Sequence, residues 1–240
     1  IFSVDDNSIY YVAPNVNKKT SPLSNIKVRQ AIYAGIDVDA LLKAIGRDGS
    51  IANQVVAQYI PGYNSAITRP KTDVAAAKQL LKDAGYPNGT SFTLTVYSGA
   101  QDAGQEIVRQ LKDIGITVKL NSISDINQLE EGATNGTFEA YYFADGSIYN
   151  DANDVFSRNL QSKYYSNSKI DTLMDQAGTS LDQTKRLDDL KQISKLAMDD
   201  VALVPLYSNV PEWVAAKPYV MTQDLLSTDL GVLFYKVHLN

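Results

Sequence analysis

The 240-residue chain contains no cysteine and a single histidine, His238, two residues before its last residue. Without cysteine it can form no disulfide, no thiolate metal site and no thiol nucleophile. A Ser-His-Asp relay or a multi-histidine zinc site would depend on a chain end, where order is least common. The chain also lacks a Walker A loop, a Gly-x-Ser-x-Gly elbow and a Gly-x-Gly-x-x-Gly motif. We therefore expect no resident metal and no cofactor.

Long apolar runs and basic clusters are also missing. No run approaches the roughly 18 apolar residues that a membrane-spanning helix needs, and residues 1–240 contain no signal-peptide pattern. We interpret the chain as a mature protein or an excised piece of a longer one. Its net charge is -5 and its basic residues are scattered, so nucleic acid is not an expected partner.

Hydrophobic periodicity predicts an α/β fold with a mixed, mostly parallel sheet flanked by helices. Strand and helix patterns alternate through the middle of the chain, at 91–98, 103–115, 116–123, 125–136 and 138–144. Further helices are predicted over 24–36, 38–46, 72–85, 168–180 and 182–200, and further strands over 201–208, 212–216 and 232–239. The stretch 50–71 has no clear period and is predicted to be a long loop. Pro205 suits an edge strand or a bulge.

Asp145 stands directly after the predicted strand 138–144, where ligands bind in many open α/β sheets. Several roles are compatible with this position. Asp145-Gly146 is a common turn pair, in which the carboxylate bonds to its own downstream backbone. The nearby Asn and Asp residues do not have the spacing of a calcium loop. A carboxylate pair with Glu130, Glu131 or Glu139 would suit glycoside hydrolysis.

A further role for Asp145 is binding without chemistry. Tyr141, Tyr142, Phe143 and Tyr149 flank it in the sequence. Aromatic walls exclude water from a bound group and strengthen its attraction to a fixed carboxylate, and their faces attract cations. Asp145 is therefore a candidate anchor for a positively charged partner.

Several segments, in order along the chain, resemble the extracytoplasmic solute-binding proteins of peptide-importing ABC transporters, the dipeptide and oligopeptide family 5. The first resembles P-x-x-(D/N)-x-x-V-R-Q-A with a later Asp, through Pro22, Asn25, Val28, Arg29, Gln30, Ala31 and Asp37. The second resembles A-x-x-L-L-x-x-A-G-(Y/F)-P-x-G over 77–89. "YYSNSKIDTLMDQA" and "VALVPLY" resemble two later family segments.

The resemblance implies which residues bind the ligand. "YFAD" falls where relatives carry W-x-x-D, whose acid pairs with the α-ammonium of a bound peptide, so the role passes to Asp145 with Tyr142 at the aromatic position. Phe143 and Ala144 in the same segment, and Tyr149, Asp151 and Asn153 in the following loop, are expected ligand contacts. Some relatives have a basic residue six places before the acid, where this chain has Glu139.

The resemblance also implies the molecular context. Residues 1–240 are expected to form one ligand-binding lobe, the carboxyl-terminal half of a two-lobe binder, with 1–15 and 219–240 as hinge and return segments. The expected function is non-catalytic binding of peptides and delivery to ABC permease subunits, in the periplasm or on a cell-surface lipoprotein. Membrane contact would come only through the permease or a lipid anchor outside this segment. The alternatives are a non-peptide solute (an oligosaccharide, opine or metal chelate), a sensor, or a carboxylate-dependent hydrolase.

Overall fold

The computed structural model describes residues 2–3, 7–210, 212–213, 219–220 and 238–239. Its centre is a six-stranded sheet in the order β3-β7-β2-β6-β4-β5. These strands are β2 (Ile9–Pro14), β3 (Gly49–Ile51), β4 (Thr90–Tyr97), β5 (Ile116–Ile123), β6 (Ala140–Asp145) and β7 (Val204–Asn209). Two short pairs lie outside it, β1 (Phe2–Ser3) with β8 (Glu212–Trp213), and β9 (Tyr219–Val220) with β10 (His238–Leu239).

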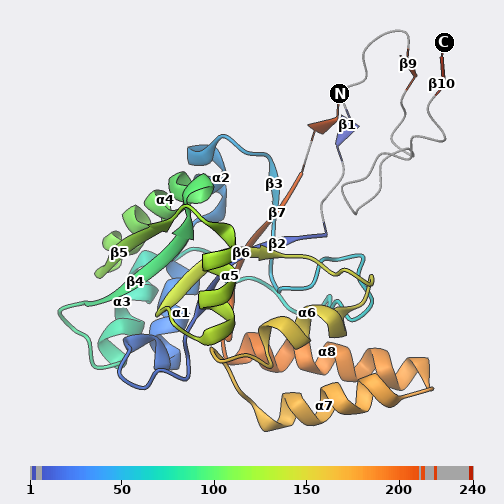
Figure 1. Cartoon of the computed structure of the whole chain (residues 1–240). Coiled ribbons are helices and arrows are strands. Elements are labelled where there is room, and N and C mark those ends of the chain that lie inside the picture. The colour runs from blue at the N-terminus through green and yellow to red at the C-terminus, as the bar shows by residue number, and fades with distance from the viewer. Residues whose placement is uncertain (1, 4–6, 211, 214–218, 221–237, 240) are drawn as a thin grey trace.

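Helices cover both faces of the sheet. They are α1 (Ile26–Gly35), α2 (Val38–Ile45), α3 (Val74–Asp83), α4 (Gln101–Asp113), α5 (Ile126–Asn135), α6 (Ala152–Asn159), α7 (Ser168–Thr179) and α8 (Gln183–Asp199). In Figure 1, α1 to α4 gather on one side of β2 and β7, and α6 to α8 on the other. None of the described helices combines the length and apolar character needed to cross a bilayer.

The predicted helices form where their capping residues stand. Asn25, Asp37 and Asp73 each precede a helix and accept a hydrogen bond from a backbone N–H of its first turn. Gly46 and Gly136 follow helices at φ 63° and 72°, in the left-handed region that glycine tolerates best. The predicted boundaries are therefore close to those observed.

The mixed α/β sheet is confirmed, but parallel pairing is limited to β6, β4 and β5. The other three neighbouring pairs are antiparallel. The expected strand-helix-strand-helix-strand unit accounts for the parallel part. The antiparallel part comes from β7 and from β2 and β3, which are not among the predicted strands; β3 overlaps the start of the predicted loop 50–71. Pro205 lies in β7, between β3 and β2, where the register with β2 shifts, so the bulge rather than the edge is observed.

One edge of the sheet gathers chain segments that are far apart in the sequence. The parallel strands β4 and β5 end there at Tyr97 and Ile123, and β6 ends there at Asp145. The antiparallel strand β2 starts at the same edge, with Ile9 opposite Asp145, and Ser208 of β7 also lies opposite Ile9. Asp145 therefore lies beside the points where the chain enters the sheet through β2 and leaves it through β7.

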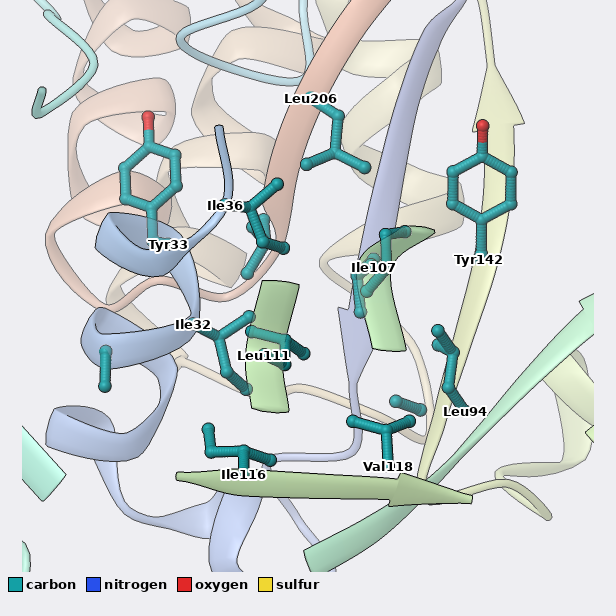
Figure 2. Packing of buried hydrophobic residues seen from close by; sticks show 14 of the residues in the cluster. Ile32, Tyr33, Ile36, Leu94, Ile107, Leu111, Ile116, Val118, Tyr142 and Leu206 are labelled. Atoms are coloured by element: carbon teal, nitrogen blue, oxygen red, sulfur yellow. The ribbon is translucent and has the colours of Figure 1, made fainter. Parts of the chain in front are cut away.

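Two hydrophobic cores flank the sheet. The first packs α1, α2, α3 and α4 against one face, and Figure 2 shows its centre around Ile32, Leu94, Ile107 and Leu111. The second packs α5 to α8 and the segment 52–60 against the other face, around buried Phe156 and Leu190. Side chains of a strand alternate between these cores because successive residues point to opposite faces.

The predicted strand 212–216 is described only at Glu212–Trp213, and the predicted strand 232–239 only at His238–Leu239. Of the expected hinge segments, 1–15 includes Ile9–Pro14, which is the strand β2 within the sheet, and 219–240 is described only at 219–220 and 238–239. The helix α6 is not among the predicted helices, and Asp151 and Asn153, which are expected in a loop, lie at its start. Its apolar residues Ala152, Val155 and Phe156, with Leu160 directly after the helix, have helical spacing, and Asp151 is a capping residue before them, so a signal was present.

Candidate functional site

The site is built around a cavity of about 1110 Å³ on the face of the sheet that carries the second core. Its walls come from the start of β2, the end of β6, helices α5 and α6, and the loops on either side of α6. Two acidic residues, Glu130 and Asp145, and two basic residues, Arg158 and Lys163, line it. A cavity of this size accommodates a small-molecule or short peptide ligand.

The Asp145 carboxylate projects into this cavity from the end of β6. The Tyr11 hydroxyl donates a hydrogen bond to Oδ2 at 2.9 Å, and Asn159 Nδ2 donates to the same oxygen at 3.1 Å. Arg158 Nε donates to Oδ1 at 3.4 Å and forms an ion pair with it. The side chain is 21% exposed. Side chains therefore hold the carboxylate, in contrast to the turn interpretation, in which its own backbone would.

Tyr11 keeps its proton and acts as a fixed donor. Its pKa is raised well above the ordinary value, first because the residue is buried and then because Tyr141 and Asp145 lie close to it. The residue comes from β2, 134 positions before Asp145. The register of β2 and β6 places Tyr11 opposite Phe143, two residues before Asp145 on the same face. Strand pairing thus builds this part of the site.

Arg158 contacts more than Asp145. It lies in the last turn of α6, and its Nη1 donates to Asp154, four residues earlier on the same helix. Its Nη2 donates to the carbonyl oxygen of Gly146 at 2.6 Å. Asp154 also accepts a hydrogen bond from the backbone N–H of Ile148 at 2.6 Å. These contacts tie α6 to the loop that follows Asp145.

The structure separates the predicted residues of β6 by face. Phe143 and Asp145 line the cavity, together with Tyr141. Tyr142 points to the opposite face, where it is buried in the first core, to which Leu94 also belongs (Figure 2). Its hydroxyl is hydrogen-bonded to the hydroxyl of Tyr207 at 2.6 Å. The side chains of Tyr142 and Ala144 do not line the cavity.

The predicted loop contacts lie at or near the start of α6. Tyr149 is 79% exposed and does not line the cavity. Asp151 caps α6 by accepting from the N–H of Asn153, and its second oxygen pairs with Arg186 Nη2 at 2.7 Å. Asn153 Oδ1 is buried and has no hydrogen-bond partner within the described parts of the chain. The structure therefore brings Asp145 and Phe143 to the cavity and leaves the loop contacts outside it.

The residues that periodicity and motifs did not indicate are Tyr11, Arg158 and Asn159. Arg158 had one usable signal, since Asp154 stands four residues before it in a segment with helical spacing. Tyr11 and Asn159 had none, because their contacts to Asp145 depend on tertiary structure.

The alternatives from sequence can be compared with the same geometry. In the described ranges, no group of three or more His, Asp or Glu residues is placed to hold a metal ion. Glu139 lies at the far end of the strand from Asp145, about 20 Å away for six extended residues, and accepts from the N–H of Thr93 at 2.9 Å. It is therefore not a partner for a carboxylate pair, whereas Glu130 shares the cavity with Asp145.

Comparison with known proteins finds a matching protein family and similar curated proteins. The family model described as bacterial extracellular solute-binding proteins, family 5 Middle, matches residues 2–167. The glutathione-binding protein GsiB of Pectobacterium atrosepticum is 28% identical over 201 residues, which cover 73% of this chain and 37% of that protein. Heme-binding protein A of Haemophilus influenzae is 27% identical over 218 residues, covering 85% of this chain and 40% of that protein.

The fold is shared with a solved structure of the same kind. The ABC transporter-associated periplasmic binding protein DppA from Helicobacter pylori, in complex with the peptide STSA, superposes with a TM-score of 0.80 at 25% identity. The match covers 99% of this chain and 48% of that one. The chain therefore spans less than half the length of these relatives.

Proposed function

We propose that this chain, which belongs to the family 5 bacterial extracellular solute-binding proteins, is one lobe of a two-lobe protein that binds peptides outside the cytoplasm. The protein delivers them to the permease of an ABC importer and does not change them chemically. Asp145 is the anchor for the free amino group of the peptide. The observation that carries the proposal is an aspartate in a large cavity, at the sheet edge where β2 enters and β7 leaves.

The geometry supports an anchor for a cation. Tyr11 and Asn159 fix one carboxylate oxygen from two sides, so the group is oriented before a ligand arrives. A preorganised carboxylate loses little conformational entropy on binding. Arg158 Nε contacts the other oxygen at 3.4 Å, a longer distance than those from Tyr11 and Asn159 to the first, and Asp145 lines the cavity from which an ammonium would approach. Phe143 and Tyr141 supply apolar wall on the same side.

In this proposal a second lobe increases the contribution of Asp145 to ligand affinity. An exposed ion pair contributes only about 0 to 1 kcal/mol, whereas a desolvated and hydrogen-bonded pair contributes more to affinity and orientation. Closure over the sheet edge that carries Asp145 would remove water from the cavity. The chain before β2 and after β7 would lead to that lobe. The lobe described here is therefore expected to bind peptide poorly by itself.

The names of the relatives agree with a peptide ligand in two of three cases. DppA is described with a bound peptide and GsiB as binding glutathione, which is itself a tripeptide. Both ligands carry a free ammonium group. Heme-binding protein A is named for a different solute, so the family resemblance alone does not identify the ligand. Asp145 is what favours an amine-bearing one.

The test uses the full-length protein and an equimolar mixture of unblocked di-, tri- and tetrapeptides, with the same mixture N-acetylated. Mass spectrometry identifies retained peptides, and calorimetry measures the affinity of the one retained best. We expect unblocked peptides to be retained intact, and Asp145→Ala to weaken binding about thirtyfold or more. The matched control is Asp113→Asn, which removes an Asp–Arg pair on α4, outside the cavity.

Equal affinity for acetylated and unblocked peptide, or unchanged affinity in Asp145→Ala, would remove the anchor. Recovery of cleaved peptides, abolished in Asp145→Asn, would instead support a hydrolase.

A further inference from the structure

Arg158 is an internal cation that already contacts the proposed anchor. Its side chain is 31% exposed, and it contacts two carboxylates, those of Asp145 and Asp154. Two carboxylates and one guanidinium leave one formal negative charge in the cluster. An ammonium group placed beside Asp145 would bring the cluster to neutrality. The charges therefore match a ligand end that carries a single positive charge.

The contacts of Arg158 with Asp154 limit how strongly Arg158 can pair with Asp145. Asp154 is only 10% exposed and lies in the first turn of α6, where the positive end of the helix dipole favours a carboxylate. Its other oxygen is fixed by the N–H of Ile148. With Nη1 on Asp154 and Nη2 on the Gly146 carbonyl, Arg158 contacts Asp145 only through Nε, at 3.4 Å. A bidentate pair with Asp145 would need Arg158 to leave these partners.

We propose that Asp154 is a positioning and charge-balancing residue, which retains Arg158 so that Asp145 stays available to the ammonium group of a ligand. This rests on the proposed function, in which Asp145 is the anchor. Arg158 competes with the ligand for Asp145, and Asp154 weakens that competition without touching the ligand. When the ammonium arrives, Arg158 keeps its contacts with Asp154 and Gly146 and gives up only the contact through Nε.

The proposal predicts opposite effects for two neighbouring residues. Asp154→Asn frees Arg158 to pair fully with Asp145 and leaves the ligand-bound cluster with one excess positive charge. We expect the affinity for unblocked peptide to fall on the order of tenfold. Arg158→Met removes the competitor, so the affinity should rise several-fold. The double variant Asp154→Asn with Arg158→Met restores the balance and should return close to the wild-type affinity.

The experiment measures these affinities by calorimetry in the full-length protein, with the best-retained unblocked peptide of the mixture described above. Asp154→Asn could also weaken binding by losing the hydrogen bond from Ile148 and disordering the loop. In that case the double variant would bind as weakly as Asp154→Asn, because removal of Arg158 cannot restore that hydrogen bond. Asp113→Asn changes the net charge equally within an Asp–Arg pair four residues apart and serves as the control.

Weaker binding in Arg158→Met would overturn the proposal, because Arg158 would then be a direct ligand contact. Unchanged affinity in Asp154→Asn, or a double variant as weak as Asp154→Asn, would overturn it as well. If wild-type protein retains no unblocked peptide, the proposed function and this inference both fail. A different result would remove only the inference. If the wild type binds peptide, Asp145→Ala loses that binding and Asp154→Asn has no effect, the proposed function stands.

Discussion

Arg29 and Arg158 are both held by several acceptors, but the acceptors differ. Arg29, on α1, is 4% exposed and donates to the backbone carbonyls of Leu23, Ser24, Asp200 and Val201. Arg158 borders a cavity and contacts two carboxylates and one carbonyl. Burial lowers the pKa of Arg29, but its ordinary value is so high that the guanidinium stays charged.

The acceptors set different roles for the two arginines. The carbonyls around Arg29 belong to backbone that cannot move without unfolding, so its role is to join α1 to the segment between α8 and β7. The carboxylates around Arg158 are side chains, and one of them faces a cavity open to ligands. In the proposed function, a ligand group replaces one of these partners. The same division separates the two faces of β6, with Tyr142 packed on one and Asp145 accessible on the other.

The largest expected effect is on Arg29. Arg29→Met retains much of the side-chain volume but leaves four buried or partly buried carbonyls without their donor. We expect the free energy of unfolding to fall by about 3 kcal/mol, measured by urea denaturation of the full-length protein. Arg158→Met should lower it by less, about 1 to 2 kcal/mol, because its side chain is 31% exposed and water can replace part of its contacts. Equal losses in the two variants would contradict the comparison.

A second, smaller effect concerns Tyr11. Tyr11→Phe removes the hydroxyl that fixes Asp145 Oδ2, so the carboxylate can turn toward Arg158. We expect the affinity for unblocked peptide to fall about fivefold, the equivalent of one hydrogen bond. Calorimetry on the full-length protein measures this. An unchanged affinity would show that Asn159 alone is enough to orient the carboxylate.

The third prediction tests the other face of β6. Tyr142→Phe removes the hydrogen bond with the Tyr207 hydroxyl in the first core. The free energy of unfolding should fall by about 1 kcal/mol, whereas peptide affinity stays unchanged because the side chain does not line the cavity. Denaturation and calorimetry are compared in the same variant. A loss of affinity without a loss of stability would restore Tyr142 as a ligand contact, as the family motif implies.

The smallest effect is a dependence on alkaline pH. Burial raises the pKa of Tyr164 from 10.0 to about 12, and the N–H of Phe138, which donates to its hydroxyl, partly opposes this. A pKa raised on folding gives stability that is complete below pH 10 and is lost as the pH rises from 10 to 12. Tyr164→Phe should flatten the decline in the free energy of unfolding over this window. A decline as steep as in the wild type would assign it to the other buried tyrosines.

Much of the fold could be predicted because its signals are local. A capping side chain such as Asp73 bonds to backbone three residues away, and helical spacing requires only that one face be apolar. The parallel unit of β4, β5 and β6 follows from alternating strands and helices. The strand β2 was missed because Ile9–Pro14 is apolar on both faces, as expected for a strand buried between two cores, and so shows no alternation.

From sequence alone, Asp145 is placed at the end of a strand, and the family motifs predict that this aspartate is the ligand anchor. The groups that surround its carboxylate follow from tertiary packing. Tyr11 reaches Asp145 through the pairing of strands 134 positions apart, and Arg158 reaches it through the packing of α6 beside the cavity. Local patterns depend on neighbours along the chain, whereas the charge and orientation of this carboxylate depend on neighbours in space.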